Sequence, residues 1–283
     1  MPRSAIGSHV PVGQGLATQG LAYAAEVGAE VVQVFLGNAR SWSAQPGDAS
    51  EDKAFRDAVE SGLPAFVHAS YLVNLGSPDA ATASRSAESL AHTLHRARQI
   101  AARGVVVHTG SSVVAGFRDR SLRQVAGTLL PLLDQLDDNA PAVLLEPTAG
   151  QGRSLCSTLD ELGVYLTALE HHPRLGLCLD TCHLFAAGHD LAARGGMKRV
   201  LDRLPEASGG VPLQLVHAND SRDAVGAHRD RHAAVGQGHI GLTPFAALLR
   251  HPACRGVPLV VETPGGRSAH RDDISTLKRL RSR

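Results

Sequence analysis

The stretch LGLCLD, residues 175–180, contains the unit that decides the fold of this chain: a short, continuous apolar run that ends in a polar residue. Such a run is typical of a parallel strand buried on both faces, because a half-exposed strand would alternate apolar and polar residues. The unit occurs eight times along the chain. The eight runs are Ser4–Gly7, Val31–Leu36, Ala65–Val67, Val105–Val107, Val143–Leu145, Leu175–Leu179, Leu213–Val216 and Leu259–Val261.

Amphipathic stretches separate these runs and are typical of helices, among them Ser86–Ala102, Leu122–Leu136 and Ser157–Glu170. Eight strand–helix repeats predict an α/β fold, a (β/α)8 TIM barrel that forms a single domain over residues 1–283. An open doubly wound sheet is the alternative. It would not explain why nearly every run ends in a residue that can bind a metal ion.

Composition and charge limit the classes of function. With 43% hydrophobic and 19% charged residues, the chain can build a packed core. A net charge of +1 argues against tight, indiscriminate binding of nucleic acid. The chain has no apolar run of membrane-spanning length and begins without the apolar stretch of a signal peptide, so we expect no membrane partner and a cytoplasmic protein.

The four cysteines form no CxxC pair, and we expect buried, free thiols. Cys178 and Cys182 flank Asp180 and could be counted as metal ligands. We expect instead that Cys178 faces away from Asp180 and that Cys182 packs in the core.

Six of the eight runs end in a good metal ligand. The six residues are His68, His108, Glu146, Asp180, His217 and Glu262. In a barrel of this class the carboxyl ends of the strands converge on one rim. A single histidine there is more often structural, and a single aspartate often caps the next helix. Three carboxylates meeting on one rim would repel, however, unless cations compensate them. The pattern therefore predicts a metal site, with zinc, manganese or iron favoured by the imidazole and carboxylate ligands.

Two further pairs enlarge this set. Asp180 and His183 lie three residues apart and would share a face if a helix begins there. Asp230 and His232 alternate in a loop bounded by glycines, and in extended backbone they would project to the same side. The total is five histidines and four carboxylates, which is enough for two or three ions.

Several motifs resemble those of endonuclease IV, the family of apurinic/apyrimidinic endonucleases with a xylose-isomerase-like barrel. The motifs that carry this resemblance are GSHV (7–10), HASYLVNL (68–75), VVHTGS (106–111), LLEPTAGQG (144–152), CLDTCHLFAAGHDL (178–191), HANDS (217–221), HRDRHAAVGQGHIG (228–241) and VETP (261–264). They extend over almost the full chain, and the pair LDTCH and DRHxxxGxGxIG is highly specific.

The resemblance implies three zinc ions per chain, with Mn²⁺ as an alternative at one or more sites. It assigns His68, His108 and Glu146 to the first ion. Glu146 would bridge to the second ion, which Asp180, His217 and Glu262 also bind, while His183, Asp230 and His232 would hold the third. The resemblance also matches three residues to positions that contact DNA in the family, namely Arg40, Tyr71 and Leu72. Without the resemblance, Arg40 would be interpreted as a solvated charge on a loop and Tyr71 as a packing residue. Thr109 and Pro147 depart from the family pattern, which usually has proline and asparagine there.

The implied activity is hydrolysis of the phosphodiester 5′ to abasic sites in double-stranded DNA, leaving a 3′-hydroxyl, with removal of 3′-blocking groups as a further activity. Clustered divalent ions can neutralise phosphate oxygens, activate water and stabilise the leaving oxygen. Glu262 is the candidate to orient or deprotonate the attacking water, and the bridging Glu146 is the second catalytic candidate. We expect a monomer, because a duplex must reach the barrel mouth, located on the nucleoid when bound to DNA.

Two other functions remain open. A sugar isomerase or epimerase on the same barrel would use only one or two metal ions and leave the group of His183, Asp230 and His232 idle. A non-catalytic protein that only binds damaged DNA would be expected to have lost ligands, and none is lost.

Overall fold

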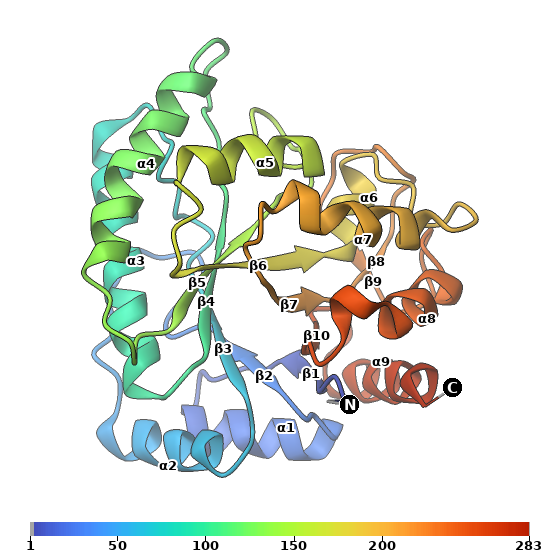
Figure 1. The fold of residues 1–283 in the computed structure, drawn as a ribbon. Helices are drawn as coiled ribbons and strands as arrows, with labels where there is room; N and C mark the ends of the chain where they lie inside the picture. Colours follow the sequence, from blue (N-terminus) through green and yellow to red (C-terminus); the bar gives the residue numbers. More distant parts are fainter. Residues whose placement is uncertain (1–2, 283) are drawn as a thin grey trace.

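The computed structural model describes residues 3–282 and contains a closed barrel of eight parallel strands (Figure 1). The strands are β1 (Ile6–His9), β2 (Val32–Val34), β3 (Ala65–His68), β4 (Gly104–His108), β5 (Ala142–Glu146), β6 (Leu175–Asp180), β7 (Leu213–His217) and β10 (Leu259–Val261). They follow chain order around the barrel, and β1 pairs with both β2 and β10. The predicted TIM barrel is confirmed, and the open sheet is wrong because no strand of the barrel lacks a neighbour.

Helices surround the barrel (Figure 1). They are α1 (Ala22–Val27), which continues the π-helical turn η1 (Leu16–Leu21), α2 (Ala49–Glu60), α3 (Ala80–Gln99), α4 (Arg118–Asp134), α5 (Leu159–Ala168), α6 (Thr181–Ala186), α7 (Gly196–Ala207), α8 (Leu242–Arg250), the 3-10 turn η2 (Pro252–Cys254) and α9 (Gly266–Arg281). Within residues 3–282, no helix combines the length and apolar character needed to span a bilayer.

The three predicted helices exist, but their first residues differ from the predictions. Helix α3 begins six residues before the predicted Ser86, because the side chain of Asp79 caps it by accepting a 2.7 Å hydrogen bond from Thr82 N. Its first turns contain few apolar residues, so the periodicity appears late. Helix α5 begins after the predicted Ser157, where Thr158 and Glu161 form a reciprocal capping box.

A separate apolar layer fills the barrel interior. It consists of Val31, Phe66, Val106, Leu144, Cys178, Leu215 and Val260. On β1 the corresponding residue is Gly7, where a Cβ atom would lie 1.7 Å from the carbonyl oxygen of Val31 and therefore could not fit.

A ring of polar residues lies one pleat above this layer, because alternate residues of a strand face the same side. Adding two to each apolar position gives His9, Gln33, His68, His108, Glu146, Asp180, His217 and Glu262. Every strand thus contributes one polar side chain toward the mouth at the carboxyl end of the barrel, above an apolar floor.

Candidate metal centre

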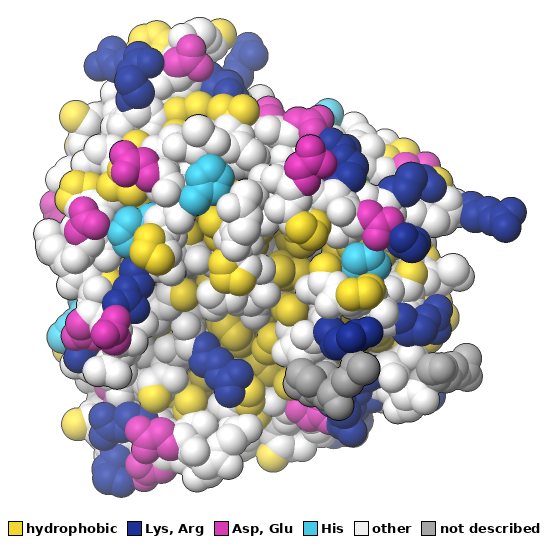
Figure 2. Space-filling view, viewed as in Figure 1, with side chains coloured by type: hydrophobic (Ala, Val, Ile, Leu, Met, Phe, Trp, Pro, Cys, Tyr) yellow, Lys and Arg dark blue, Asp and Glu magenta, His cyan; other side chains and the backbone are white. Residues whose placement is uncertain are grey.

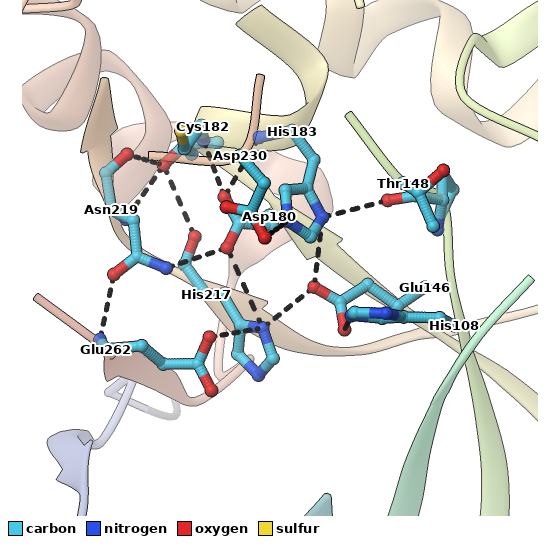
Figure 3. A network of polar contacts seen from close by, with 12 residues as sticks. His108, Glu146, Thr148, Asp180, Cys182, His183, His217, Asn219, Asp230 and Glu262 are labelled. Atoms are coloured by element: carbon cyan, nitrogen blue, oxygen red, sulfur yellow. Dashed lines mark hydrogen bonds and ion pairs between the residues drawn. The ribbon is translucent and has the colours of Figure 1, made fainter. Parts of the chain in front are cut away.

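Glu146, at the end of β5, is fully buried and lies beside His108, His183 and His217 (Figure 3). Its Oε2 atom lies 3.3 Å from His68 Nε2 and 3.4 Å from His108 Nε2. Its Oε1 atom lies 3.0 Å from His217 Nδ1 and 3.3 Å from His183 Nδ1. The two oxygens of one carboxylate therefore face two different groups of histidines.

A second group surrounds His217, which is also fully buried. Besides Glu146, its Nδ1 atom faces Glu262 Oε2 at 3.4 Å and Asp180 Oδ2 at 3.9 Å. Three carboxylates from β5, β6 and the end of β10 thus point at one imidazole nitrogen on β7. These four side chains are the set that the resemblance assigns to the second ion.

The third group lies at the edge of the mouth. His183 Nε2 is 3.2 Å from Asp230 Oδ2, and His232 Nε2 is 2.9 Å from Asp230 Oδ1. Helix α6 begins at Thr181, as the spacing of Asp180 and His183 required. Residues 230–232 are not helical, and the intervening Arg231 pairs with Asp223 instead. All nine residues predicted as ligands therefore meet at one barrel mouth.

Asp180 caps a helix and also faces the cluster of candidate ligands, two functions that the sequence left as alternatives. Its Oδ1 atom caps α6 by accepting hydrogen bonds from Cys182 N at 2.6 Å and His183 N at 3.1 Å. Its Oδ2 atom accepts from Asn219 Nδ2 at 2.7 Å and faces His232 Nε2 at 3.5 Å. The helix cap fixes the carboxylate so that its other oxygen points into the cluster.

Backbone carbonyls orient three of the five histidines. The Nδ1 atoms of His68, His183 and His232 lie 2.7, 3.1 and 3.2 Å from the carbonyl oxygens of Ala69, Pro147 and Glu262. A carbonyl can only accept, so each Nδ1 carries the proton and each Nε2 offers a lone pair to the cluster. This arrangement is typical of metal-binding histidines.

The donor set fits divalent metal ions. Among residues 3–282, the buried atoms Glu146 Oε2 and His232 Nε2 lie close to other ligand atoms, but none of these contacts has the geometry of a hydrogen bond. In a tetrahedral zinc site with ligand distances of about 2.0–2.1 Å, adjacent ligand atoms lie about 3.3–3.4 Å apart. The separations of Glu146 Oε2 from His68 and His108 have this value. The ligand atoms of His183, Asp230 and His232 also lie within 4.8 Å of one another.

Electrostatics favours positive charge in the cluster. Burial alone would raise the pKa of Glu146, but His217 and His108 outweigh burial and hold the pKa well below its ordinary value. Burial would lower the pKa of His232, but Asp180 and Asp230 outweigh it and raise the pKa to about 9. Protons and metal ions therefore compete for the same lone pairs.

A family model described as a xylose isomerase-like TIM barrel matches residues 21–280. A protein of Streptomyces coelicolor named as a probable endonuclease 4 is 54% identical to this chain, over 99% of the chain and 96% of its own length. The chain belongs to the endonuclease IV family. The crystal structure of endonuclease IV from Thermus thermophilus has a TM-score of 0.83 and 33% identity, and covers 98% of both chains. An E. coli 3-keto-D-glucoside 4-epimerase, with a TM-score of 0.69, 16% identity and coverage of 98% of this chain and 100% of its own, shares the fold alone.

The two departures from the endonuclease IV pattern are accommodated without displacing a ligand. The N–H of Thr109, which a proline would lack, donates to the carbonyl oxygen of Glu146 at 3.1 Å, and its Oγ1 donates to Cys156 O at 2.9 Å. Pro147 is buried and presents its carbonyl oxygen to His183. The residue after the central carboxylate thus still orients a neighbouring histidine.

The three residues matched to DNA contacts of endonuclease IV lie on two loops at the same mouth. Arg40 is exposed on the loop after β2, and Leu72 is partly buried on the loop after β3. Tyr71 is 47% exposed, and its ring packs on His68 and His108 with centroid distances of 5.3 and 5.8 Å. Tyr71 therefore connects the surface directly to the candidate metal centre.

Sequence reasoning missed His9 and Gln33, and it was wrong about Cys178. Counting two residues from each interior apolar position would have found both polar residues. The same count shows that Cys178 and Asp180 face the same side. The Cys178 thiol lies in the barrel interior with its Sγ within 4.8 Å of ligand atoms of Glu146 and His217. Burial raises the pKa of this thiol to about 12. Cys182 is buried, as predicted, and its thiol lies 3.7 Å from Arg231 O. The expectation that it packs in the apolar core is wrong, because its Sγ lies within 4.8 Å of ligand atoms of Asp180 and His232.

Proposed function

We propose that this protein is a metal-dependent endonuclease that hydrolyses the phosphodiester 5′ to abasic sites in double-stranded DNA and leaves a 3′-hydroxyl. Its family membership makes it a DNA-cleaving hydrolase. One observation supports metal-dependent cleavage at abasic sites. Five histidines and four carboxylates, among them the buried Glu146, meet at one barrel mouth. Removal of 3′-blocking groups is part of the proposal, because it breaks the same kind of bond.

The residues would hold three divalent ions, for which we propose zinc, with Mn²⁺ as the alternative at one or more positions. His68, His108 and Glu146 would form the first site, and His183, Asp230 and His232 the third. Between them, Glu146 would share the second site with Asp180, His217 and Glu262. When bound, such ions supply positive charge for the phosphate oxygens and lower the pKa of water.

Glu262 is suited to orient the attacking water. Its side chain is 13% exposed, so one edge reaches the mouth, while Gln33 Nε2 holds its Oε1 at 2.6 Å. Burial would raise its pKa, but His217 and His9 outweigh burial and lower the pKa below its ordinary value. A carboxylate that stays ionised is a weak proton acceptor but a strong hydrogen-bond acceptor. We infer that Glu262 directs the water more than it removes its proton.

Recognition of DNA would rely on shape. An abasic nucleotide stacks poorly, so bending the duplex and extruding the nucleotide require less free energy than with an intact base. We propose that Tyr71 and Leu72 insert into the base stack beside the lesion and that Arg40 enters the minor groove. Exposed Arg40, Arg153 and Arg229 lie on loops at the carboxyl end of the barrel, where they can meet phosphates.

The face drawn in Figure 2 does not present one basic patch. On the face drawn in Figure 2, Lys and Arg side chains alternate with Asp and Glu, in agreement with the net charge of +1. This distribution favours local contacts at the mouth over coating of the protein by DNA. We therefore propose a monomer that binds one duplex at the barrel mouth.

A nicking assay tests the proposed function. Purified protein is incubated with a duplex that contains one abasic site, with and without a chelator, and separately with a ketose. We expect a single 5′ incision that the chelator abolishes and that added Zn²⁺ restores, and no change in the ketose. Turnover of the sugar without incision would instead support an isomerase, and binding of DNA without incision in the presence of metal would support a non-catalytic protein.

A further inference from the structure

Gln33, on β2, is a fully buried amide that the metal sites do not use as a ligand. It makes three hydrogen bonds at the edge of the cluster. Its Oε1 atom lies 2.8 Å from His217 Nε2, and its Nε2 atom lies 2.6 Å from Glu262 Oε1 and 3.0 Å from His9 Nδ1. One side chain therefore contacts both a histidine and a carboxylate of the second site.

Chemistry fixes the orientation of this amide. An ionised carboxylate only accepts hydrogen bonds, so the NH₂ group of Gln33 must face Glu262. The other N–H then donates to His9 Nδ1. The carbonyl oxygen is left for His217, and because a carbonyl only accepts, His217 Nε2 must carry the hydrogen.

The hydrogen bonds from Gln33 to Glu262 and His217 determine which ring nitrogen of His217 is unprotonated. With the proton on Nε2, the lone pair of Nδ1 points at Glu146, Glu262 and Asp180. Other histidines of the cluster, such as His68, are oriented by backbone carbonyls, which substitution cannot remove. His217 depends on a side chain.

We propose that Gln33 is a positioning residue that holds His217 in its Nε2–H tautomer and fixes the carboxylate of Glu262, and that it thereby strengthens metal binding at the second site. The inference rests on the proposed metal-dependent function and adds a residue to it. Outer partners of ligating histidines change metal affinity by about 10- to 100-fold when they are removed.

The substitution Gln33→Met tests this role because it keeps the length of the side chain and removes all three polar contacts. The matched control is Gln214→Met, which changes the same residue type at the other end of the barrel, on β7. Zinc affinity is measured by competition with a chromophoric chelator. We expect Gln33→Met to hold its most weakly retained zinc about 10- to 100-fold less tightly than the wild type, and the control to match the wild type.

Thermal unfolding separates positioning from a purely structural role. We expect the melting temperature of Gln33→Met to fall more in the zinc-loaded than in the metal-free protein. Equal losses in both states, or zinc affinity equal to that of the wild type, would overturn the inference. A wild-type protein that binds zinc but does not nick DNA would refute the proposed function alone, whereas one that binds no zinc would refute both.

A spectroscopic test needs only the folded wild type. Long-range ¹H–¹⁵N spectra of the zinc-loaded protein, assigned with a His217→Asn variant, report which imidazole nitrogen carries the proton. We expect a proton on His217 Nε2 and none on Nδ1. The opposite tautomer contradicts the inference even if Gln33→Met does not fold.

Discussion

Glu262 lies at the boundary between the buried cluster and solvent, and this position separates it from Glu146. Glu146 is enclosed by four histidines, whereas Glu262 has one exposed edge. A fully buried carboxylate can serve as a ligand, but only one that reaches the mouth can also contact water or substrate. At the scale of single residues, exposure therefore distinguishes the proposed functions of the two glutamates.

The substitution Glu262→Gln tests this distinction. The amide oxygen can still accept the hydrogen bond from Gln33, so we expect the protein to fold. We expect the single-turnover rate of incision to fall by about 10²- to 10⁴-fold, the range for loss of a group that positions or accepts a proton. Glu26→Gln is the control, because Glu26 lies outside the barrel and pairs with Arg267 at 3.1 Å. A wild-type rate in Glu262→Gln would rule out the proposed role.

The substitution Arg40→Ala tests the proposed contact with DNA. The loop around it is shaped by Asn38, whose Oδ1 accepts from Arg40 N at 2.9 Å, so loss of the guanidinium leaves the backbone in place. We expect Arg40→Ala to raise KM for the abasic duplex, to change kcat little, and to reduce the slope of log affinity against log salt by about 1. Arg279→Ala, on an exposed position of α9, is the control. An unchanged KM and salt slope would argue against the contact.

At the scale of structural elements, Asp220 organises the loop that follows β9 (His232–Ala233). Asp220 is fully buried on β8 (Asp220–Ser221), which pairs antiparallel with β9. Its Oδ1 accepts from the N–H groups of Ser221 and Ile240, both at 2.8 Å. Its Oδ2 accepts from those of Gly236 and Gly241, at 2.9 and 3.1 Å. One carboxylate thus satisfies four backbone donors.

The glycine pattern of this loop has a steric cause. A Cβ atom at Gly238 would lie 2.2 Å from Ser221 O and 2.6 Å from Asp220 Oδ1. Because β9 carries His232, the loop that Asp220 folds also positions the third proposed metal site. The motif DRHxxxGxGxIG therefore combines two proposed metal ligands with the glycines that allow the chain to wrap around a buried carboxylate.

We expect Asp220→Asn to reduce the free energy of unfolding by about 2–5 kcal/mol, because the amide NH₂ would face backbone donors and leave some of them unpaired. Urea unfolding of the metal-free protein measures the loss, and metal analysis should find one zinc fewer per chain. Asp223→Asn is the matched control in the same segment, where the carboxylate pairs with the exposed side chain of Arg231. Equal stability of the two variants would contradict this account of the loop.

At the scale of the whole molecule, the barrel separates apolar and polar layers by one pleat. The apolar floor supports the polar ring from below, and each strand delivers its ring residue at the same end. Repulsion among the carboxylates is balanced by protonated histidines when metal is removed. The stability of the metal-free protein should therefore depend on pH.

The direction of this dependence follows from the shifted pKa values. The pKa of His232 rises from its ordinary 6.5 to about 9 in the folded protein, so its protonation stabilises the fold fully below 6.5 and no longer above about 9. We expect the melting temperature of chelator-treated protein to fall as the pH rises from 6.5 to 9. With zinc bound, ions replace the protons on the histidines, and the melting temperature should no longer fall as the pH rises from 6.5 to 9. Identical pH profiles with and without zinc would contradict a shared site for ions and protons.

The sequence by itself determined the barrel and the nine candidate ligands. Continuous Val- and Leu-rich runs are typical of strands buried on both faces, and in a barrel the residue at the end of each run reaches the common rim. His68, Glu146 and Asp180 were identified for this reason. The first residues of the helices were predicted less accurately than the strands. A capping residue such as Asp79 determines where a helix begins, and apolar periodicity does not reveal this position when the first turns contain few apolar residues.

Only the tertiary structure decided which atoms face one another. Three features depend on the order and stagger of strands around the closed barrel. The two oxygens of Glu146 face different groups of histidines, the two oxygens of Asp180 have different partners, and Gln33 contacts both His217 and Glu262. The sequence specifies which side of a strand a residue faces, because that depends on local alternation. It does not specify distances across the barrel, because those arise only when eight separate strands close into one sheet.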